Sequence, residues 1–597
     1  MRPGLGATPD DHGATAFTVW APEADQVEVC RGPDRVLLAG DVTGYHRGTA
    51  PWAAGTRYTY VLDGGPHLPD PASRSQPDGV HGPSQVVDLT YPWDDQNFRA
   101  DPLREWVLYE LHVGTFTTEG TFAGAAARLD DIVHLGATAV EIMPVAQFPG
   151  RRNWGYDGVF PFAVQHSYGG PEGLQGFVAE CHRHGLAVVL DVVYNHLGPE
   201  GNVLGSFAPY FTDRYQTPWG PAVNLDGPYS DEVRSFFLAN ARQWFEYFHI
   251  DALRLDAVHE FIDRSARPFL AELAATAEEL THRLGRPCVL IAESADNNPL
   301  VVSPVVDHGL GMQAQWNDDF HHSVHAMLTG EQGGYYLDFG RADDVARAMN
   351  QGFVYQGQYS AFRRRRHGAP SLGVPPERFV TFVQNHDQIG NRPDGSRLSS
   401  LVSSQQLRLA AALLLLAPGI PLLFMGEEYG EQAPFAYFVD HGDPALLDAV
   451  RKGRAAEHGA SRSRSVPDPG DAATFEAAVL RREDLLGKSP HKELLQLYRD
   501  LIALRRREPA LHRSARENTE AHADGDVVTL VRRHEEGVIA AFFNLSDSAT
   551  SNELPTEGMW EELLTHQQAP WLEQKIELAP WQCRVFRLSS PHDGAGA

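Results

Sequence analysis

The chain has 597 residues, with 50 lysines and arginines against 78 aspartates and glutamates, so its formal net charge is −28. This length is too great for one hydrophobic core, and we expect roughly two to four domains. The composition, 42% hydrophobic and 21% charged, is typical of a globular protein that folds in water. The negative charge repels phosphate and anionic lipid, which argues against nucleic acid or a membrane surface as a partner.

Cysteine use and apolar stretches bear on the cellular compartment. The four cysteines lie far apart and form no CxxC pair, so the sequence predicts neither a disulfide framework nor a zinc ribbon. Residues 1–17 contain no apolar segment of a secretory signal, and we expect a cytoplasmic protein. The apolar run Leu409–Gly426 is interrupted by Pro-Gly-Ile-Pro, which predicts a buried helix and strand rather than a membrane span.

Alternating apolar and polar residues mark both ends of the chain as β structure. Runs such as Ala16–Trp20 and Arg57–Leu62 lie between turn residues, and they predict a β-sandwich domain over residues 1–95. The strands return near Val527–Val531, which predicts a small C-terminal β domain over residues 515–597.

In residues 96–514, short apolar runs alternate with helical patterns. Continuous apolar strands that alternate with helices predict a parallel sheet covered on both faces. Eight such units fit an α/β fold of the (β/α)8 barrel type, while an open doubly wound sheet is disfavoured because no Gly-x-Gly-x-x-Gly opens a unit. The eight candidate strands lie in Trp106–Val113, Ala139–Val145, Leu186–His196, Asp251–Val258, Cys288–Ser294, Gly311–Trp316, Phe379–Asp387 and Ile420–Glu428.

Polar and acidic residues gather where these strands end, which is where the active site of such a barrel lies. These residues are Asn195, His196, Arg254, Asp256, Glu293, His386, Asp387, Glu427 and Glu428. At least three carboxylates from three different strands are therefore expected to converge on one site.

Strand alternation assigns roles to two of these acids. Arg254 and Asp256 are two residues apart and point to the same side, so the guanidinium favours the ionised carboxylate that a nucleophile requires. Glu293 ends an apolar strand, so we expect its negative charge to be less compensated than that of Asp256. It is therefore the better candidate for a protonated general acid. One ionised and one protonated carboxyl group is the arrangement that cleaves glycosidic bonds.

Four ordered motifs resemble the motif regions of the α-amylase superfamily. They are DVVYNH at Asp191–His196, DALRLDAVH at Asp251–His259, IAES at Ile291–Ser294 and FVQNHDQIGN at Phe382–Asn391. The resemblance implies a retaining enzyme acting on α-glucans, with Asp256 as nucleophile, Glu293 as general acid/base and Asp387 as stabiliser of the transition state.

The same resemblance implies further contacts around the sugar ring at subsite −1. Arg254, His196 and His386 would contact the sugar or the catalytic acids, with Asp191 as a structural partner inside the site. Tyr156 would stack on the sugar with Asp157 beside it, although loop packing is an equal alternative for Trp154, Tyr156 and Trp219. Asp318, His321 and His322 follow the sixth strand; by resemblance they would line the side of the cleft that binds the leaving part of the substrate, with a surface cluster as the alternative.

Longer segments narrow the resemblance to the maltooligosyltrehalose trehalohydrolase family. They are Glu141–Leu174, Asp191–Asn202, Pro209–Gly227 and Trp316–Gly340. This implies hydrolysis of the α-1,4 bond that joins trehalose to the rest of a maltooligosyltrehalose substrate. His259 and Glu260 stand where α-amylases usually have Lys-His, which disfavours a simple α-amylase and makes both residues candidates for substrate binding.

Other functions and bound groups remain as alternatives. The runner-up is a glycogen-branching transferase, and a non-catalytic glucan-binding protein is a third reading, disfavoured because all three acid positions are filled. No HExxH or EF-hand spacing occurs, so we expect no metal and no cofactor. For Asn195 we favour a structural hydrogen bond over a metal-binding role, and for Arg363–Arg366 a solvated loop over an anion site.

Overall fold

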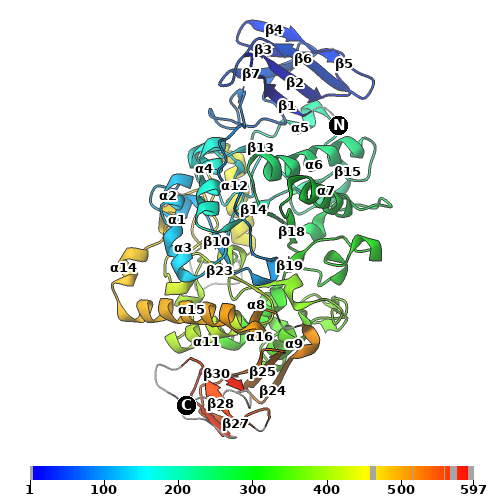
Figure 1. Ribbon diagram of the computed structural model, residues 1–597. Helices are drawn as coiled ribbons and strands as arrows, with labels where there is room; N and C mark the ends of the chain where they lie inside the picture. Colours follow the sequence, from blue (N-terminus) through cyan, green and yellow to red (C-terminus); the bar gives the residue numbers. More distant parts are fainter. Residues whose placement is uncertain (1–3, 458–465, 514, 557, 565–574, 589–597) are drawn as a thin grey trace.

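The computed structural model describes residues 4–457, 466–513, 515–556, 558–564 and 575–588. The N-terminal strands form one end of the molecule, the C-terminal strands form the opposite end, and the large α/β region lies between them (Figure 1). The expected boundaries at residues 95 and 514 stay predictions, and residue 514 itself lies outside the described residues.

Eight parallel strands close into a barrel, which confirms the predicted fold class. Each of the eight apolar runs contains one of them: β10 Leu108–Leu111, β11 Ala139–Ile142, β14 Ala187–Val192, β17 Ala252–Leu255, β18 Val289–Ala292, β19 Ala314–Trp316, β22 Phe379–Thr381 and β23 Ile420–Phe424. The first strand pairs with both the second and the last, so an open sheet is excluded.

The register of neighbouring strands decides which side chains share the barrel interior. Asp191 of β14 lies beside Arg254 of β17, and Arg254 lies beside Ile291 of β18. Side chains at equivalent positions of adjacent strands point to the same side of a sheet. The interior below this level is an apolar cluster that includes Leu108, Ala252 and Leu422.

Helices cover the barrel, as the sequence predicts. They include α4 Gly170–Arg183, α6 Ser230–Tyr247, α7 Phe269–Leu284, α11 Ser404–Leu416 and α15 Ser489–Arg507. The last two run side by side (Figure 1), and buried Arg505 of α15 donates hydrogen bonds to the carbonyls of Leu415, Ala417 and Gly419. These bonds satisfy carbonyl groups in the last turn of α11 and in the segment that follows it, where the helix offers no partner.

The apolar run Leu409–Gly426 forms the end of α11, a turn and strand β23, which confirms the predicted helix–strand pair. Among the described residues, no helix is both long enough and apolar enough to cross a membrane. All four cysteines are free, which confirms that none is in a disulfide.

Antiparallel sheets form both ends of the chain. At the N-terminus, one sheet contains β1 Gly6–Pro9, β2 Thr15–Trp20, β6 Tyr45–Ala50 and β5 Ala39–Gly40, and the other contains β4 Asp34–Leu37, β3 Val27–Arg31, β7 Arg57–Leu62 and β8 His67–Leu68, with β9 Ser84–Gln85 paired to β7. Trp20 and Trp52 lie in the core of this domain, whereas Trp93 is half-buried and stacks on His249.

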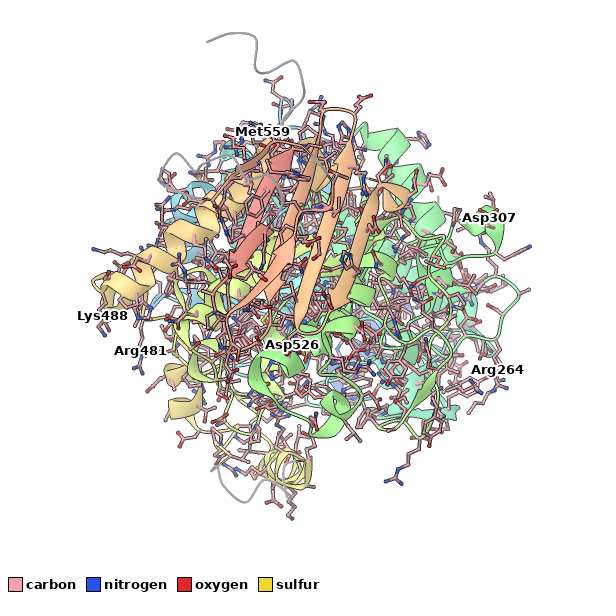
Figure 2. All side chains as sticks on the ribbon, turned by 90° about the horizontal axis from the view of Figure 1, so that it is seen from below. Arg264, Asp307, Arg481, Lys488, Asp526 and Met559 are labelled. Atoms are coloured by element: carbon pink, nitrogen blue, oxygen red, sulfur yellow. The ribbon has the colours of Figure 1, made fainter. Side chains whose placement is uncertain are left out.

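The C-terminal sheet contains β24 Thr519–Asp524, β25 Val527–His534, β26 Gly537–Asn544, β30 Cys583–Leu588 and β28 Trp560–Glu562 in that spatial order. Seen from below, its strands cross the middle of the molecule, with Asp526 at the turn between β24 and β25 (Figure 2). Phe542 and Trp560 are fully buried, so this sheet has an apolar core of its own.

Candidate active site

Arg254 is the charged centre of the group of acids at the carboxyl ends of the barrel strands. Its side chain is fully buried, and Nη1 donates to both carboxylate oxygens of Asp191 at 2.8 and 2.7 Å and to Oδ1 of Asp256 at 3.0 Å. Nη2 forms an ion pair with Oε2 of Glu293 at 2.9 Å. The guanidinium lies 4.2 Å from the ring centre of Trp316, a cation–π contact. One cation therefore holds three carboxylates from adjacent strands.

The expectation that the negative charge of Glu293 is less compensated than that of Asp256 is wrong. Besides the ion pair with Arg254, its Oε2 accepts a hydrogen bond from the backbone N–H of Ala257 at 2.8 Å. Ala257 has φ = 39°, a left-handed conformation that is unfavourable for a residue with a side chain. This strained residue directly follows Asp256 and aims its N–H at Glu293, a contact that strand alternation does not reveal.

Asp387 comes to the same site from β22 through the short helix α10, His386–Gly390. Its Oδ2 lies 3.6 Å from Nε2 of His386, and its side chain is 33% exposed. Burial and the nearby charge of Glu293 raise the pKa of Asp387, against the opposing charge of His386. The structure thus brings Asp256, Glu293 and Asp387 together around Arg254 and His386.

Tyr156 joins these groups through its hydroxyl. Its Oη lies 2.6 Å from Oδ2 of Asp191 and 2.7 Å from Nε2 of His386, and its ring stacks on the His386 ring. Burial raises the pKa of Asp191 to about 7, although Arg254 opposes the rise. Tyr156 therefore lies within the group of acids, whereas Trp154 is 3% exposed and stacks on Phe435, which confirms the loop-packing alternative for Trp154.

His196 and Trp219 stack on each other next to Tyr156. The Nε2 of His196 lies 2.9 Å from the carbonyl oxygen of Tyr156, and burial lowers the pKa of the imidazole. Trp219, in the turn between β15 Phe211–Thr217 and β16 Gly220–Val223, stacks on the His196 ring at 4.4 Å and is 48% exposed. Asp157 is bound by Asn153 and by the hydroxyl of Tyr437.

Asp318 begins helix α8, Asp318–Thr329, and lies near two of the three acids. Burial and the charges of Glu293 and Asp387 raise the pKa of Asp318 to about 8. Its Oδ1 accepts a hydrogen bond from Nε2 of Gln388, and the Gln388 Oε1 lies 3.4 Å from the hydroxyl of Tyr335. His321 and His322 are buried, so the surface-cluster alternative for them is wrong.

The arginine run 363–366 is only in part a solvated loop. Arg364, Arg365 and Arg366 are exposed, as predicted. Arg363 is half-buried, its charge opposes the rise in the pKa of Asp318, and its Nη1 has no hydrogen-bond partner among the described residues. The sequence carries no signal for this difference, because all four side chains are alike.

His259, Glu260 and the side chain of Asn195 do not bond to the group of acids around Arg254. His259 and Glu260 lie on a short 3-10 helix after β17, with a contact of 4.0 Å between them, and in the described part of the chain neither is hydrogen bonded or ion paired with the three acids. The prediction of a structural hydrogen bond for Asn195 is wrong for its side chain, because neither amide atom has a partner among the described residues.

A grouping of possible metal ligands lies away from this site, at the turn between β25 and β26. It consists of His534, Glu535 and Glu536.

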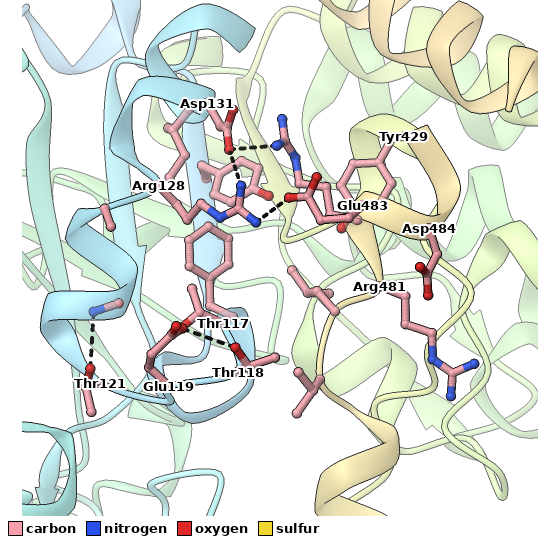
Figure 3. Close-up of a pocket in the computed structure, with 18 of the residues that line it drawn as sticks. Thr117, Thr118, Glu119, Thr121, Arg128, Asp131, Tyr429, Arg481, Glu483 and Asp484 are labelled. Atoms are coloured by element: carbon pink, nitrogen blue, oxygen red, sulfur yellow. Dashed lines mark hydrogen bonds and ion pairs between the residues drawn. The ribbon is translucent and has the colours of Figure 1, made fainter. Parts of the chain in front are cut away.

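Glu427 and Glu428 also end a barrel strand, but they lie outside the group. Glu427 accepts a hydrogen bond from Tyr498 of α15, and Glu428 accepts one from Tyr109. Glu428 lines a separate cavity of about 920 Å³, whose walls carry Arg128, Asp131 and Glu483 (Figure 3). Glu427 and Glu428 lie in a short 3-10 helix after β23, where side chains no longer alternate between the two sides of a strand. Their position at the end of a strand therefore predicted the wrong location for their side chains.

Sequence reasoning missed two acids inside the barrel, Glu110 of β10 and Glu141 of β11. Each is 1% exposed, and each is the one charged residue of an otherwise apolar strand. Neither oxygen of Glu141 has a hydrogen-bond partner among the described residues, and burial and Glu110 raise its pKa well above the ordinary value. An isolated acid in an apolar strand run was the available signal.

Comparison with known proteins places this geometry in a family. The family model of the alpha amylase catalytic domain matches residues 68–212. A crystal structure from Salmonella typhimurium, of a provisionally named alpha amylase, superposes with a TM-score of 0.90 at 36% identity, covering 99% of this chain and 100% of that chain. A glycogen-branching enzyme of Burkholderia lata is more distant, at 27% identity over 95% of this chain and 78% of its own.

Two curated relatives carry the name malto-oligosyltrehalose trehalohydrolase and match most of the chain. The protein of Arthrobacter ramosus is 47% identical, covering 83% of this chain and 87% of its own. The protein of Rhizobium sp. strain M-11 is 42% identical, covering 96% of this chain and 98% of its own. With the closed barrel and its group of acids, these similarities show that the chain belongs to the malto-oligosyltrehalose trehalohydrolase family.

Proposed function

We propose that this chain is a retaining glycoside hydrolase that cleaves the α-1,4 bond next to the terminal trehalose unit of maltooligosyltrehalose. The products are trehalose and a malto-oligosaccharide. The observation that carries the proposal is the shared ion pairing of Asp191, Asp256 and Glu293 with Arg254, beside Asp387. Family membership supplies the substrate class.

Asp256 acts as the nucleophile in the first step. Its carboxylate oxygen forms a bond to C1 of the sugar, while the bond between C1 and the glycosidic oxygen breaks. Glu293 donates its proton to that oxygen, so trehalose leaves with a free hydroxyl group. The hydrogen bond from Arg254 at 3.0 Å supports this role, because it fixes the orientation of the Asp256 carboxyl group.

Water completes the reaction in the second step. Glu293, now ionised, takes a proton from a water molecule whose oxygen bonds to C1, and the bond between C1 and Asp256 breaks. Two displacements at C1 restore the original anomeric configuration. The contacts of Glu293 with Arg254 and with the Ala257 N–H suit this step, because both stabilise the carboxylate that acts as base.

Asp387, His386 and Tyr156 surround the sugar ring at which charge develops. The transition state resembles an oxocarbenium ion, and the carboxylate of Asp387 would stabilise its positive charge. Asp318 would contact the leaving trehalose. With its pKa raised to about 8, Asp318 is protonated at neutral pH and can donate a hydrogen bond to a sugar oxygen.

Incubation with maltotriosyltrehalose, followed by analysis of the released sugars, tests the proposal. We expect trehalose and maltotriose in equal amounts, with the maltotriose formed first as the α anomer. Glucose and maltose without trehalose would reject the substrate assignment, and an initial β anomer would reject the retaining mechanism. Amylose should gain no branch points, as judged by iodine staining, because a gain would favour the branching transferase.

A further inference from the structure

A buried acid of the first barrel strand contacts His386 from the side opposite the catalytic group. Glu110 is 1% exposed, and its Oε1 lies 2.5 Å from Nδ1 of His386. Its Oε2 also accepts a hydrogen bond from the backbone N–H of His386 at 3.3 Å. Two bonds from one carboxylate fix both the ring and the backbone at the start of α10.

Hydrogen-bond directions along this contact define where the imidazole carries its protons. The Tyr156 hydroxyl has one proton, and above about pH 7, where Asp191 is ionised, it donates that proton to Asp191 at 2.6 Å. The Tyr156 oxygen then accepts from Nε2–H of His386 at 2.7 Å. Oε1 of Glu110 accepts from Nδ1–H, so both ring nitrogens act as donors.

Other charged groups face His386, but Glu110 is the carboxylate that reaches Nδ1. Asp191 is engaged by Arg254 and Tyr156, Asp387 lies 3.6 Å from Nε2, and Glu141 has no hydrogen-bond partner among the described residues. The titratable and charged groups around the ring are Glu110, Glu141, Asp191, Arg254, Asp387, Tyr156 and His112.

We propose that Glu110 is a positioning residue that keeps His386 doubly protonated and directs its Nε2–H toward Tyr156 and Asp387. A positive imidazolium at this place holds the Asp387 carboxylate close and presents a fixed donor to the site. Burial alone would lower the pKa of His386, but the charges of Asp387 and Glu110 and the hydrogen bond to Glu110 raise it to about 9.

The test is a titration of His386 in the full-length protein, read from the histidine ring signals in NMR spectra. The His386 signal is assigned by its loss in His386→Gln. We expect a midpoint near pH 9 in the parent and a midpoint at least one pH unit lower in Glu110→Gln, which keeps the shape of the side chain but not its charge. Glu427→Gln is the matched control, because it changes a buried acid at the end of another barrel strand that bonds to Tyr498 and not to His386, and the His386 midpoint of this variant should stay with the parent.

Kinetics supply a second readout. In Glu110→Gln, kcat should fall on the order of 10- to 100-fold with KM little changed, because sugar contacts remain while the imidazolium is lost. Glu110→Asp keeps the charge at a longer distance and should restore part of both kcat and the midpoint. A parent midpoint below pH 7, or a Glu110→Gln midpoint equal to the parent's, would overturn the proposal.

The titration needs no substrate, so it is independent of the proposed trehalose-releasing activity. If that activity fails while the midpoints move as expected, the role of Glu110 stands and the substrate assignment falls. If the activity holds and the midpoints do not move, Glu110 is only a structural acid.

Discussion

Two layers inside the same barrel have opposite chemistry. The barrel floor consists of Leu108, Ala139, Val189, Ala252 and Ile291, together with neighbours such as Leu422. The charged layer consists of Glu110, Glu141, Asp191, Arg254 and Glu293, each two residues further along the same strands. Side chains two residues apart point to the same side of a strand, so one inward row changes from apolar to ionisable toward the carboxyl ends.

On each of these strands, a residue that packs in the apolar floor and a residue of the charged layer are therefore only two positions apart. The floor is a packed apolar core, in which every methyl group contributes to the free energy of unfolding. The charged layer buries groups that are costly to desolvate, and it is held together by ion pairs around Arg254. Substitutions in the two layers should therefore affect different measurements.

The largest effect is expected for Asp256→Asn. The amide cannot form the bond to C1, so kcat for trehalose release should fall by about 10⁴-fold, the scale of losing a nucleophile. Calorimetric titration with maltotriosyltrehalose should show that binding persists. Retention of more than a tenth of the activity would contradict the assignment of Asp256, and unchanged circular dichroism is the control for folding.

The next largest effect is expected for Arg254→Lys. Lysine keeps the positive charge but has a single ammonium group, which cannot pair at once with Asp191, Asp256 and Glu293. Misplacement of the acids by about 1 Å should lower kcat on the order of 100-fold. Steady-state kinetics check this, and parent-like kcat would mean that charge alone, without geometry, is sufficient.

A substitution in the apolar floor should lower stability and leave catalysis unchanged. Leu422→Ala removes a fully buried side chain from β23, a strand that supplies no member of the charged layer. The free energy of unfolding should fall by about 2–5 kcal/mol, measured by urea denaturation. At a temperature where the variant is folded, kcat and KM should stay near parent values, and a selective loss of kcat would show that the two layers are coupled.

The last prediction concerns the pH dependence of stability at Asp318. The pKa of this acid is raised to about 8 by burial and by the charges of Glu293 and Asp387, so the folded protein holds its proton more tightly than the unfolded chain. Its contribution to stability is full below about pH 4 and is lost as the pH rises through 8. Asp318→Asn should flatten the fall in unfolding free energy between pH 4 and 8, as urea denaturation can show, and an unchanged slope would contradict the raised pKa.

How much of the site could be predicted differs from residue to residue. Arg254 and Asp256 were predictable as neighbours, because alternation within one strand is a local rule. The ion pair of Arg254 with Glu293 and the N–H of Ala257 were not, because they depend on the register between strands and on a left-handed residue. Asn195 was misread for the same reason: its partners, or their absence, depend on distant segments.

The sequence by itself determined the eight strands, their order and the parallel barrel, because apolar periodicity and helix alternation are written along the chain. It also contained the motifs that assign the family. Only the tertiary structure decided that Glu110 contacts His386, that Glu427 and Glu428 turn away, and that Arg363 differs from its neighbours. Contacts between residues hundreds of positions apart are set by how strands and loops meet in space, which no local pattern encodes.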